Sequence, residues 1–231
     1  MLSSDEFQAL RLSLQVASLG TLLGLPIALA IGWVLVKSSI RGKVVLDTLV
    51  SFPLVLPPVI TGYFLLLMLG RNGPIGSFLH DAFGVDLVFT WVAAALAAGL
   101  VSLPLMVRAI EVAIAGVDPR LERAARSLGA GPLRTIATVT IPLAYRGILA
   151  AALLGFARGL GEFGATMVVA GNVPGQTQTI PLAMFTDLQA GDDGGAVRLV
   201  VLSLSLALIS LSIHHVLVRR RGLLRRPWAT S

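Results

Sequence analysis

The 231-residue chain contains no cysteine, which excludes disulfide bridges and thiolate metal sites. Charged residues are also scarce, at 13% of the chain, where a soluble domain carries about 25%. Hydrophobic residues make up 55%, and the mean hydropathy is +0.86. Because about 20 consecutive apolar residues span a bilayer, this composition predicts a protein that crosses the membrane several times.

Sequence motifs for catalysis are missing as well. The histidines are His80, His214 and His215, and no carboxylates accompany them at a metal-binding spacing. There is no phosphate-binding P-loop sequence, so we do not expect the chain to hydrolyse ATP. The apolar segments offer no Ser/His or Asp/Asp pair for an intramembrane protease. We therefore predict a protein that is not an enzyme and has neither a cofactor nor a metal ion.

Five apolar segments are long enough to cross the membrane with some tilt. Their continuous apolar runs favour helices over a barrel, whose strands alternate in polarity. The first residues lack the basic region of a signal peptide, so we expect the first segment to be part of the structure. The prediction is an all-α integral membrane protein, one domain over 1–231, with spans at about 10–36, 44–69, 88–115, 142–169 and 197–218.

Basic residues are distributed unevenly between the two ends of these spans. The connections at 37–43 and 120–134 and the C-terminal segment carry most of them, whereas the opposite side holds Arg11, Arg71 and Arg198. The positive-inside rule therefore predicts that the N-terminus is outside and the C-terminus is cytoplasmic. We interpret the closing RRRGLLRR sequence as part of this anchor, in contact with lipid, in preference to a nucleic-acid site.

The two predicted outer loops differ in length. Residues 70–87 combine turn-forming residues with a short amphipathic piece, and residues 171–196 are longer and rich in glycine and polar residues. Within the longer loop, IPLAMFTDLQA is expected to form one short helix that begins at Pro181. Loops of this length within a compact domain are often functional.

A short charged helix is predicted at 118–130, on the cytoplasmic side. Asp118 suits an N-cap, Pro119 suits the first helical position, and Gly129 suits a left-handed C-terminal cap. Glu122 and Arg126 have the i,i+4 spacing of an ion pair.

One face of this helix is apolar but slim. Its members, spaced at i, i+3, i+4 and i+7, are Leu121, Ala124, Ala125 and Leu128. Two interpretations stay open, an interfacial helix that lies on lipid and a helix that docks in a groove of a cytoplasmic partner. The shortage of large apolar side chains weakens the lipid interpretation.

These residues resemble the EAA loop of ABC importer permeases, with the pattern E-x-A-A-x3-G-x9-[IV]-x-[LI]-P. The matching positions are Glu122, Ala124, Ala125, Gly129, Val139, Ile141 and Pro142. Four further stretches are similar to the molybdate permeases of that family: FPLVLPPVITGYFLLLMLGRNGPIG (52–76), LPLMVRAI (103–110), FARGLGEFGAT (156–166) and VPGQTQTIPLAMFTDLQ (173–189). The resemblance thus covers nearly the whole chain.

The resemblance implies a type I importer permease fold in the bacterial cytoplasmic (inner) membrane. The 118–130 helix would be the coupling helix and would engage a separate ATP-binding subunit through Leu121, Glu122, Ala124, Ala125, Leu128 and Gly129. Two copies of the chain would form a homodimer with two ATPase subunits, and an outer binding protein would deliver molybdate. Alternatives are a permease for tungstate or sulfate, a gradient-driven secondary transporter, and a structural or assembly membrane protein.

Two groups of residues within the spans are candidates for a translocation path or gate. Pro57, Pro58 and Gly62 indicate either a packing kink or a broken helix that lines a path. Arg158 and Glu162 are four residues apart on one predicted helix, where a charge costs at least ~2.5 kcal/mol. They indicate either an internal ion pair or a gate in which the arginine attracts an oxyanion and the glutamate weakens its binding.

Overall fold

The computed structural model describes residues 3–39 and 41–219, and the regular structure in these residues is helical throughout. Beyond Arg219, the predicted basic anchor lies outside the described residues. In chain order the helices are α1 (Ser4–Lys37), α2 (Lys43–Val55), α3 (Pro58–Leu69), α4 (Pro74–Phe83), α5 (Trp91–Ala115), α6 (Pro119–Ser127), α7 (Pro132–Thr135), the π-helix η1 (Ile136–Thr140), α8 (Ile141–Leu160), α9 (Gly164–Ala170), α10 (Ile180–Ala190) and α11 (Asp193–Arg219).

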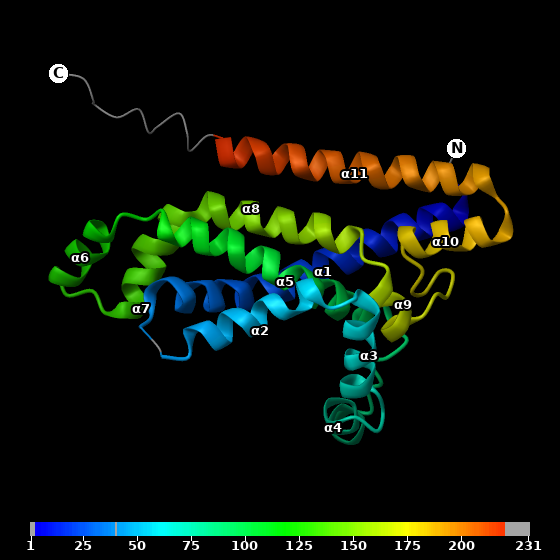
Figure 1. Cartoon of the computed structure of the whole chain (residues 1–231), viewed down its shortest axis with the longest axis horizontal. Helices are drawn as coiled ribbons and strands as arrows, with labels where there is room; N and C mark the ends of the chain where they lie inside the picture. The colour runs from blue at the N-terminus through cyan, green and yellow to red at the C-terminus, as the bar shows by residue number, and fades with distance from the viewer. Residues whose placement is uncertain (1–2, 40, 220–231) are drawn as a thin grey trace.

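The membrane-crossing part of the described chain consists of long, nearly parallel helices (Figure 1). Four helical segments, at 4–37, 91–115, 132–160 and 193–216, are long and apolar enough to cross a bilayer. The pair α2 and α3 adds a fifth crossing if the two are counted as one span. The fold is therefore an all-helical membrane protein with four or five candidate spans.

The core of the bundle is built largely from small residues. α5 buries a run of alanines, Ala93, Ala94, Ala95, Ala97 and Ala98, against α1 and α9. At the crossing of α1 and α5, a Cβ added to Gly20 would lie 2.6 Å from the Ala95 carbonyl oxygen and 2.9 Å from the Gly99 nitrogen. Small residues let membrane helices approach to backbone contact, and this approach sets the spacing of the bundle.

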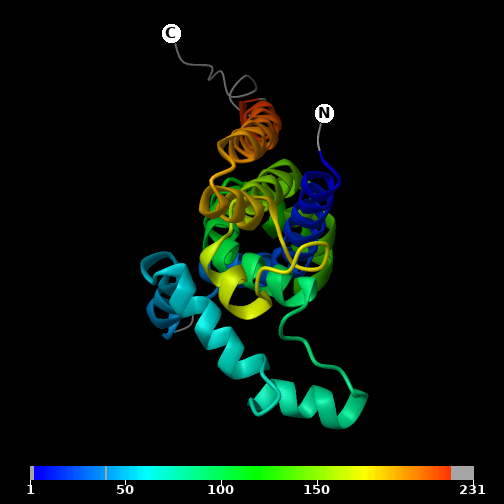
Figure 2. The ribbon, with the colours of Figure 1, turned by 90° about the vertical axis from the view of Figure 1, so that its right-hand side faces the viewer.

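The predicted second span is divided at Leu56 and Pro57. Proline supplies no N–H and pushes the residue before it into extended backbone. Leu56 and Pro57 are accordingly extended, with ψ of 139° and 131°, and α2 and α3 meet at 112°. As a result α3 and α4 project away from the bundle (Figure 2).

The predicted fourth span is also divided. α8 ends at Leu160, residues 161–163 are not helical, and α9 then begins at Gly164. The stretch predicted as one helix to residue 169 is therefore two helices. The short helix predicted at 180–190 is present as α10.

We expect Gly20→Ala to destabilise the protein, because the new methyl group would collide with the α5 backbone. Overpacking of this kind costs about 1–3 kcal/mol. Thermal unfolding of the detergent-solubilised protein measures the effect. Gly42→Ala is the matched control, since a Cβ there meets nothing within 4 Å. Equal unfolding temperatures for the two variants would contradict the close packing of α1 on α5.

Candidate functional site

The helix α6 is closed at both ends by the expected residues. The Asp118 side chain accepts a hydrogen bond from the Arg120 N–H at 2.9 Å, and Pro119 occupies the first turn. Gly129 has φ +85°, in the left-handed region. The N–H groups of Gly129 and Ala130 bond to the carbonyls of Arg126 and Ala125, which is the Schellman pattern of helix ends. α6 is therefore a short helix that its own sequence defines.

Glu122 fixes α6 to the rest of the protein. Its carboxylate accepts a hydrogen bond from Lys37 Nζ at 2.9 Å and another from Thr140 Oγ1 at 2.7 Å. The Glu122 side chain is 10% exposed, and Lys37 is 19% exposed. The ion pair expected with Arg126 is not among those of the described residues, because the carboxylate turns inward to Lys37 at the end of α1.

Opposing effects set the protonation of Glu122. Burial by itself raises the pKa of this carboxyl group, whereas the hydrogen bonds from Lys37 and Thr140 and the charges of Lys37 and Arg126 lower it. The result is a pKa below the ordinary value for glutamate. The carboxylate is therefore charged at neutral pH, as its contact with Lys37 requires.

The apolar side of α6 faces away from the protein. Leu121 is 48% exposed and Leu128 is 88% exposed, and Ala124 beside them is exposed as well. Ala125 is partly buried. The six residues predicted to engage an ATPase thus separate into an inward-facing Glu122 and an outward-facing apolar surface, with Gly129 at the end of the helix.

A π-helical turn connects α6 and α7 to the membrane helix α8. In η1 the Ile141 N–H bonds to the Ile136 carbonyl, five residues back, and Pro142 follows without an N–H of its own. Thr140 lies at the end of this turn, is 2% exposed, and donates to Glu122. π-Turns are frequent at functional sites, and this one contains part of the EAA-like motif.

The two broken spans contact each other at their breaks. A Cβ added to Gly62 on α3 would lie 2.6 Å from the Ala165 carbonyl oxygen on α9. A Cβ added to Gly164 would lie 3.1 Å from the Pro58 Cβ. The structure thus brings two of the predicted path residues, Pro58 and Gly62, against the start of α9.

Arg158 and Glu162 form the predicted ion pair, at 3.0 Å between Nη1 and Oε2. They are not on one continuous helix, because α8 ends between them. The other Glu162 oxygen accepts the N–H of Ala165 at 2.9 Å and so caps the first turn of α9. With its side chain 1% exposed, Glu162 connects the end of α8 to the start of α9.

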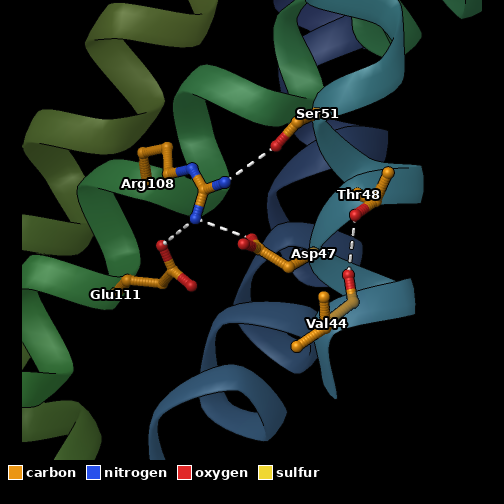
Figure 3. A network of polar contacts seen from close by, with 6 residues as sticks. All are labelled: Val44, Asp47, Thr48, Ser51, Arg108 and Glu111. Atoms are coloured by element: carbon orange, nitrogen blue, oxygen red, sulfur yellow. Dashed lines mark hydrogen bonds and ion pairs between the residues drawn. The ribbon is translucent and has the colours of Figure 1, made fainter. Parts of the chain in front are cut away.

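A third set of charged residues joins α2 to α5, and the sequence analysis did not identify it. Figure 3 shows Arg108 of α5 reaching across to Asp47 and Ser51 of α2. Arg108 Nη1 contacts Asp47 Oδ1 at 2.7 Å and Glu111 Oε2 at 2.9 Å, and Nη2 donates to Ser51 Oγ at 2.7 Å. Asp47 lies within a predicted span, where acidic residues are rare, and that position was a usable signal.

These contacts hold the two halves of the broken span to different partners. Arg108 ties α2 to α5, whereas Gly62 allows α3 to lie directly on α9. The bend at Pro57 therefore lies between two segments that are attached to different helices. In the hinges of many transport proteins, a few residues at helix ends absorb the motion.

No group of three or more His, Asp or Glu side chains suited to a metal ion occurs in the part of the chain that the structure describes.

The chain matches a known transporter family over most of its length. Residues 20–222 match the family described as "Binding-protein-dependent transport system inner membrane component". The chain belongs to this family. It is therefore a multi-pass membrane component of an ABC-type importer, and it is a transport subunit, not an enzyme.

Within the family, the chain is similar to permeases of one kind. It is 50% identical over 220 residues to the "Molybdenum transport system permease protein ModB" of Escherichia coli K12, covering 95% of this chain and 96% of that protein. It is 44% identical over 216 residues to the ModB protein of Haemophilus influenzae, covering 93% and 94%. A "Putative molybdenum transport system permease protein" of Bacillus subtilis is 36% identical over 191 residues, covering 83% and 84%.

Solved structures show the same fold at low sequence identity. A bacterial ABC transporter that imports the acidic polysaccharide alginate superposes with a TM-score of 0.72 at 17% identity, covering 94% of this chain and 80% of that one. An amino acid ABC transporter superposes with a TM-score of 0.63 at 20% identity, covering 94% of both chains. The resemblance noted in the sequence is thus confirmed for the family and for the fold of ABC importer permeases.

We expect Glu122→Gln to loosen α6, because a neutral amide loses the charge-assisted bond to Lys37. Trypsin should cleave the variant faster at the arginines of α6, and Asp86→Asn, an exposed carboxylate in the loop between α4 and α5, is the control. The stability difference from the native chain should be present at neutral pH. It should disappear as the pH falls through the folded pKa of Glu122, which lies below the ordinary value for glutamate, because the carboxyl group is then protonated. If trypsin cleaved Glu122→Gln at the same rate as the native chain, Glu122 would not be the anchor of α6.

We expect Arg108→Met to destabilise the protein by about 1–3 kcal/mol, since it leaves Asp47 and Glu111 without a counter-charge. Adding Asp47→Asn and Glu111→Gln should recover much of that loss, because all three charges are then gone. Thermal unfolding in detergent measures both variants. A triple variant no more stable than the single one would show that the arginine acts mainly through packing.

Proposed function

We propose that the chain is the membrane-spanning permease of an ATP-driven molybdate importer. The observation that supports this most directly is its 50% identity, over 95% of its length, to a molybdenum transport permease. An importer permease needs a path across the membrane and a surface for its motor. The junction of the two broken spans and the helix α6 are candidates for these two parts.

We propose that the α6 end of the bundle is cytoplasmic. Lys37, Arg41 and Lys43 lie between α1 and α2 at this end, and α6 adds three arginines. Positive charge concentrates on the cytoplasmic side of membrane proteins. The N-terminus is then outside, together with α10 and the start of α11.

The exposed apolar side of α6 is the proposed docking surface for the ATPase. Leu121, Ala124 and Leu128 would enter a groove of the ATP-binding subunit, in the manner of other helix-in-groove contacts. Alanine keeps this side slim enough for close approach. Glu122 has a different role in this proposal, since it holds α6 to α1 and η1 so that a force on α6 reaches the membrane helices.

We propose that two copies of the chain form the transport unit with two ATPase subunits. Large apolar side chains remain exposed on α2, α3 and α4: Val44, Val45, Leu49, Phe52, Leu54, Val55, Val59, Ile60, Tyr63, Phe64, Leu67, Ile75, Phe78 and Phe83. Exposed apolar surface of this extent needs a cover. A second copy and membrane lipid would provide it, and an outer molybdate-binding protein would dock on the outer loops.

The translocation path is proposed to pass the junction of the two broken spans, with Pro57, Pro58, Gly62, Arg158 and Glu162 as gate elements. Closure of the ATPase dimer would pull the coupling helices together and open the path outward, and hydrolysis would reset it inward. In this junction Glu162 neutralises Arg158, so an oxyanion that passes meets no deep energy well.

The test is uptake of labelled molybdate by cells that lack their own molybdate permease and carry this chain with its importer partners. We expect the native chain to restore uptake and Gly129→Asp to reduce it about tenfold or more, which corresponds to a loss of about 1.4 kcal/mol in docking free energy. An acid at the C-terminal end of α6 opposes the helix dipole and lies beside the docking surface. Membrane abundance of both chains is measured in parallel.

Gly191→Asp is the matched control, because Gly191 also has a left-handed backbone, with φ +76°, and an added Cβ there also meets nothing within 4 Å. Gly191 ends α10, at the opposite end of the bundle from α6. If sulfate or tungstate competed fully with molybdate for uptake, that oxyanion would be assigned as the substrate in place of molybdate. Normal uptake by Gly129→Asp, or by cells without the ATPase, would favour a gradient-driven transporter.

A further inference from the structure

A cavity of about 560 Å³ opens at the end of the bundle opposite α6. It lies between the start of α1, the chain before α5 and the loop before α10. Its lining residues are Gln8, Arg11, Leu12, Gln15, Phe89, Thr90, Trp91, Gly175, Gln176 and Thr177. Arg11 and Lys37 are 26 positions apart on α1, about 39 Å at 1.5 Å per residue, so the cavity and the α6 anchor lie on opposite sides of a bilayer core.

The cavity lining is rich in hydrogen-bond donors and contains no carboxylate. Gln8, Gln15 and Gln176 each carry an amide group that can donate two hydrogen bonds. Thr177, which is 1% exposed, accepts the N–H of Val173, and its hydroxyl hydrogen remains available to donate. The one charged group in the lining is the guanidinium of Arg11.

Arg11 differs from the other two arginines predicted on this side. Arg198 pairs with Glu6 at 2.7 Å, and Arg71 lies 3.0 Å from His80. Among the described residues, the Arg11 side chain has neither an ion-pair partner nor a hydrogen-bond partner. Its charge, which arginine retains at all physiological pH values, is therefore free to meet an anion.

The wall of the cavity is held in an unusual backbone geometry. Phe89 has φ +59°, which is rare for a bulky residue, and its N–H bonds to the Val169 carbonyl of α9 at 2.9 Å. Gly175 has φ +74°, and a Cβ there would lie 2.7 Å from Gln8 Oε1. Strained backbone such as that of Phe89 occurs at ligand sites, and here the hydrogen bond of Phe89 joins the cavity wall to α9.

We propose that this cavity is a receiving site for a tetrahedral oxyanion on the outer face of the permease. Arg11 supplies the attraction, and the glutamine amides and Thr177 supply neutral donors around the anion oxygens. One water molecule occupies about 30 Å³, so the cavity of about 560 Å³ has room for the anion together with several waters. The anion therefore enters with part of its hydration shell and binds weakly. Weak binding suits a transport route. The identity of the anion as molybdate rests on the proposed function.

The test uses the assembled importer, permease with ATPase, in lipid nanodiscs without the outer binding protein. Broadening of the molybdenum NMR line of added molybdate detects weak binding. We expect saturable broadening with the native chain and a rise in the dissociation constant of about tenfold or more with Arg11→Gln. Arg11→Lys should retain part of the affinity, because it keeps the charge without the guanidinium fork.

Two more variants separate the site from general effects. Gly175→Ala keeps every charge but places a methyl group against Gln8, and it should also weaken binding. Arg71→Gln removes an exposed arginine outside the cavity, and it should leave binding unchanged. Binding of sulfate and phosphate is measured in parallel by equilibrium dialysis of the radiolabelled ions. The proposal would be overturned if the native chain bound none of molybdate, sulfate and phosphate saturably, or if the native chain and Arg11→Gln bound them with equal affinity.

The same experiment distinguishes this proposal from the proposed function. If the native importer takes up molybdate and Arg11→Gln changes neither binding nor uptake, the receiving site is wrong and the importer assignment stands. If sulfate or phosphate binds in an Arg11-dependent way and molybdate neither binds nor enters the cell, the receiving site stands and molybdate is wrong as the substrate.

Discussion

The contact of Glu122 with Lys37 and Thr140 is the interaction on which the rest of this structure depends. α6 is nine residues long, its apolar side faces outward, and helices this short are marginal on their own in water. Its end caps define where it starts and stops, but they do not attach it to anything. One inward-facing carboxylate attaches it to the end of α1 and to the turn that begins α8. A load on α6 is thereby shared between two membrane helices.

From this anchor a continuous series of contacts leads to the broken spans. η1 continues directly into α8, α8 ends at the pair of Arg158 with Glu162, and Glu162 caps α9. α9 then lies against α3 through Gly62. α2 is attached separately, to α5 through Arg108. The prolines between α2 and α3 thus join two segments with different attachments, and in the proposed transport cycle they are where a difference in motion would be absorbed.

Features that depend on residues close together in the sequence were predicted well. The caps of α6, the helix at 180–190, the pair of Arg158 with Glu162 and the family all follow from patterns of spacing and motif. The breaks in two spans were only partly predictable. Pro57 and Pro58 pointed to the first, whereas the i,i+4 spacing of Arg158 and Glu162 suggested one continuous helix across the second. The partner of Glu122 was missed because Lys37 is 85 positions away in the chain. Arg126, the opposite charge at the i,i+4 spacing, was the wrong choice, since the carboxylate of Glu122 turns inward to Lys37 and Thr140.

The described arginines differ in whether they are paired with a carboxylate. Among the described residues, Arg108, Arg158 and Arg198 each contact a carboxylate, whereas Arg146 of α8 contacts the hydroxyl of Tyr145. Arg11, at the end of the bundle opposite α6, has no such partner among the described residues. In the proposed transport unit, the charge of Arg11 would favour capture of an anion but would give no net driving force for crossing. That force has to come from elsewhere, and we propose that it enters through α6, with its exposed apolar side and its buried anchor.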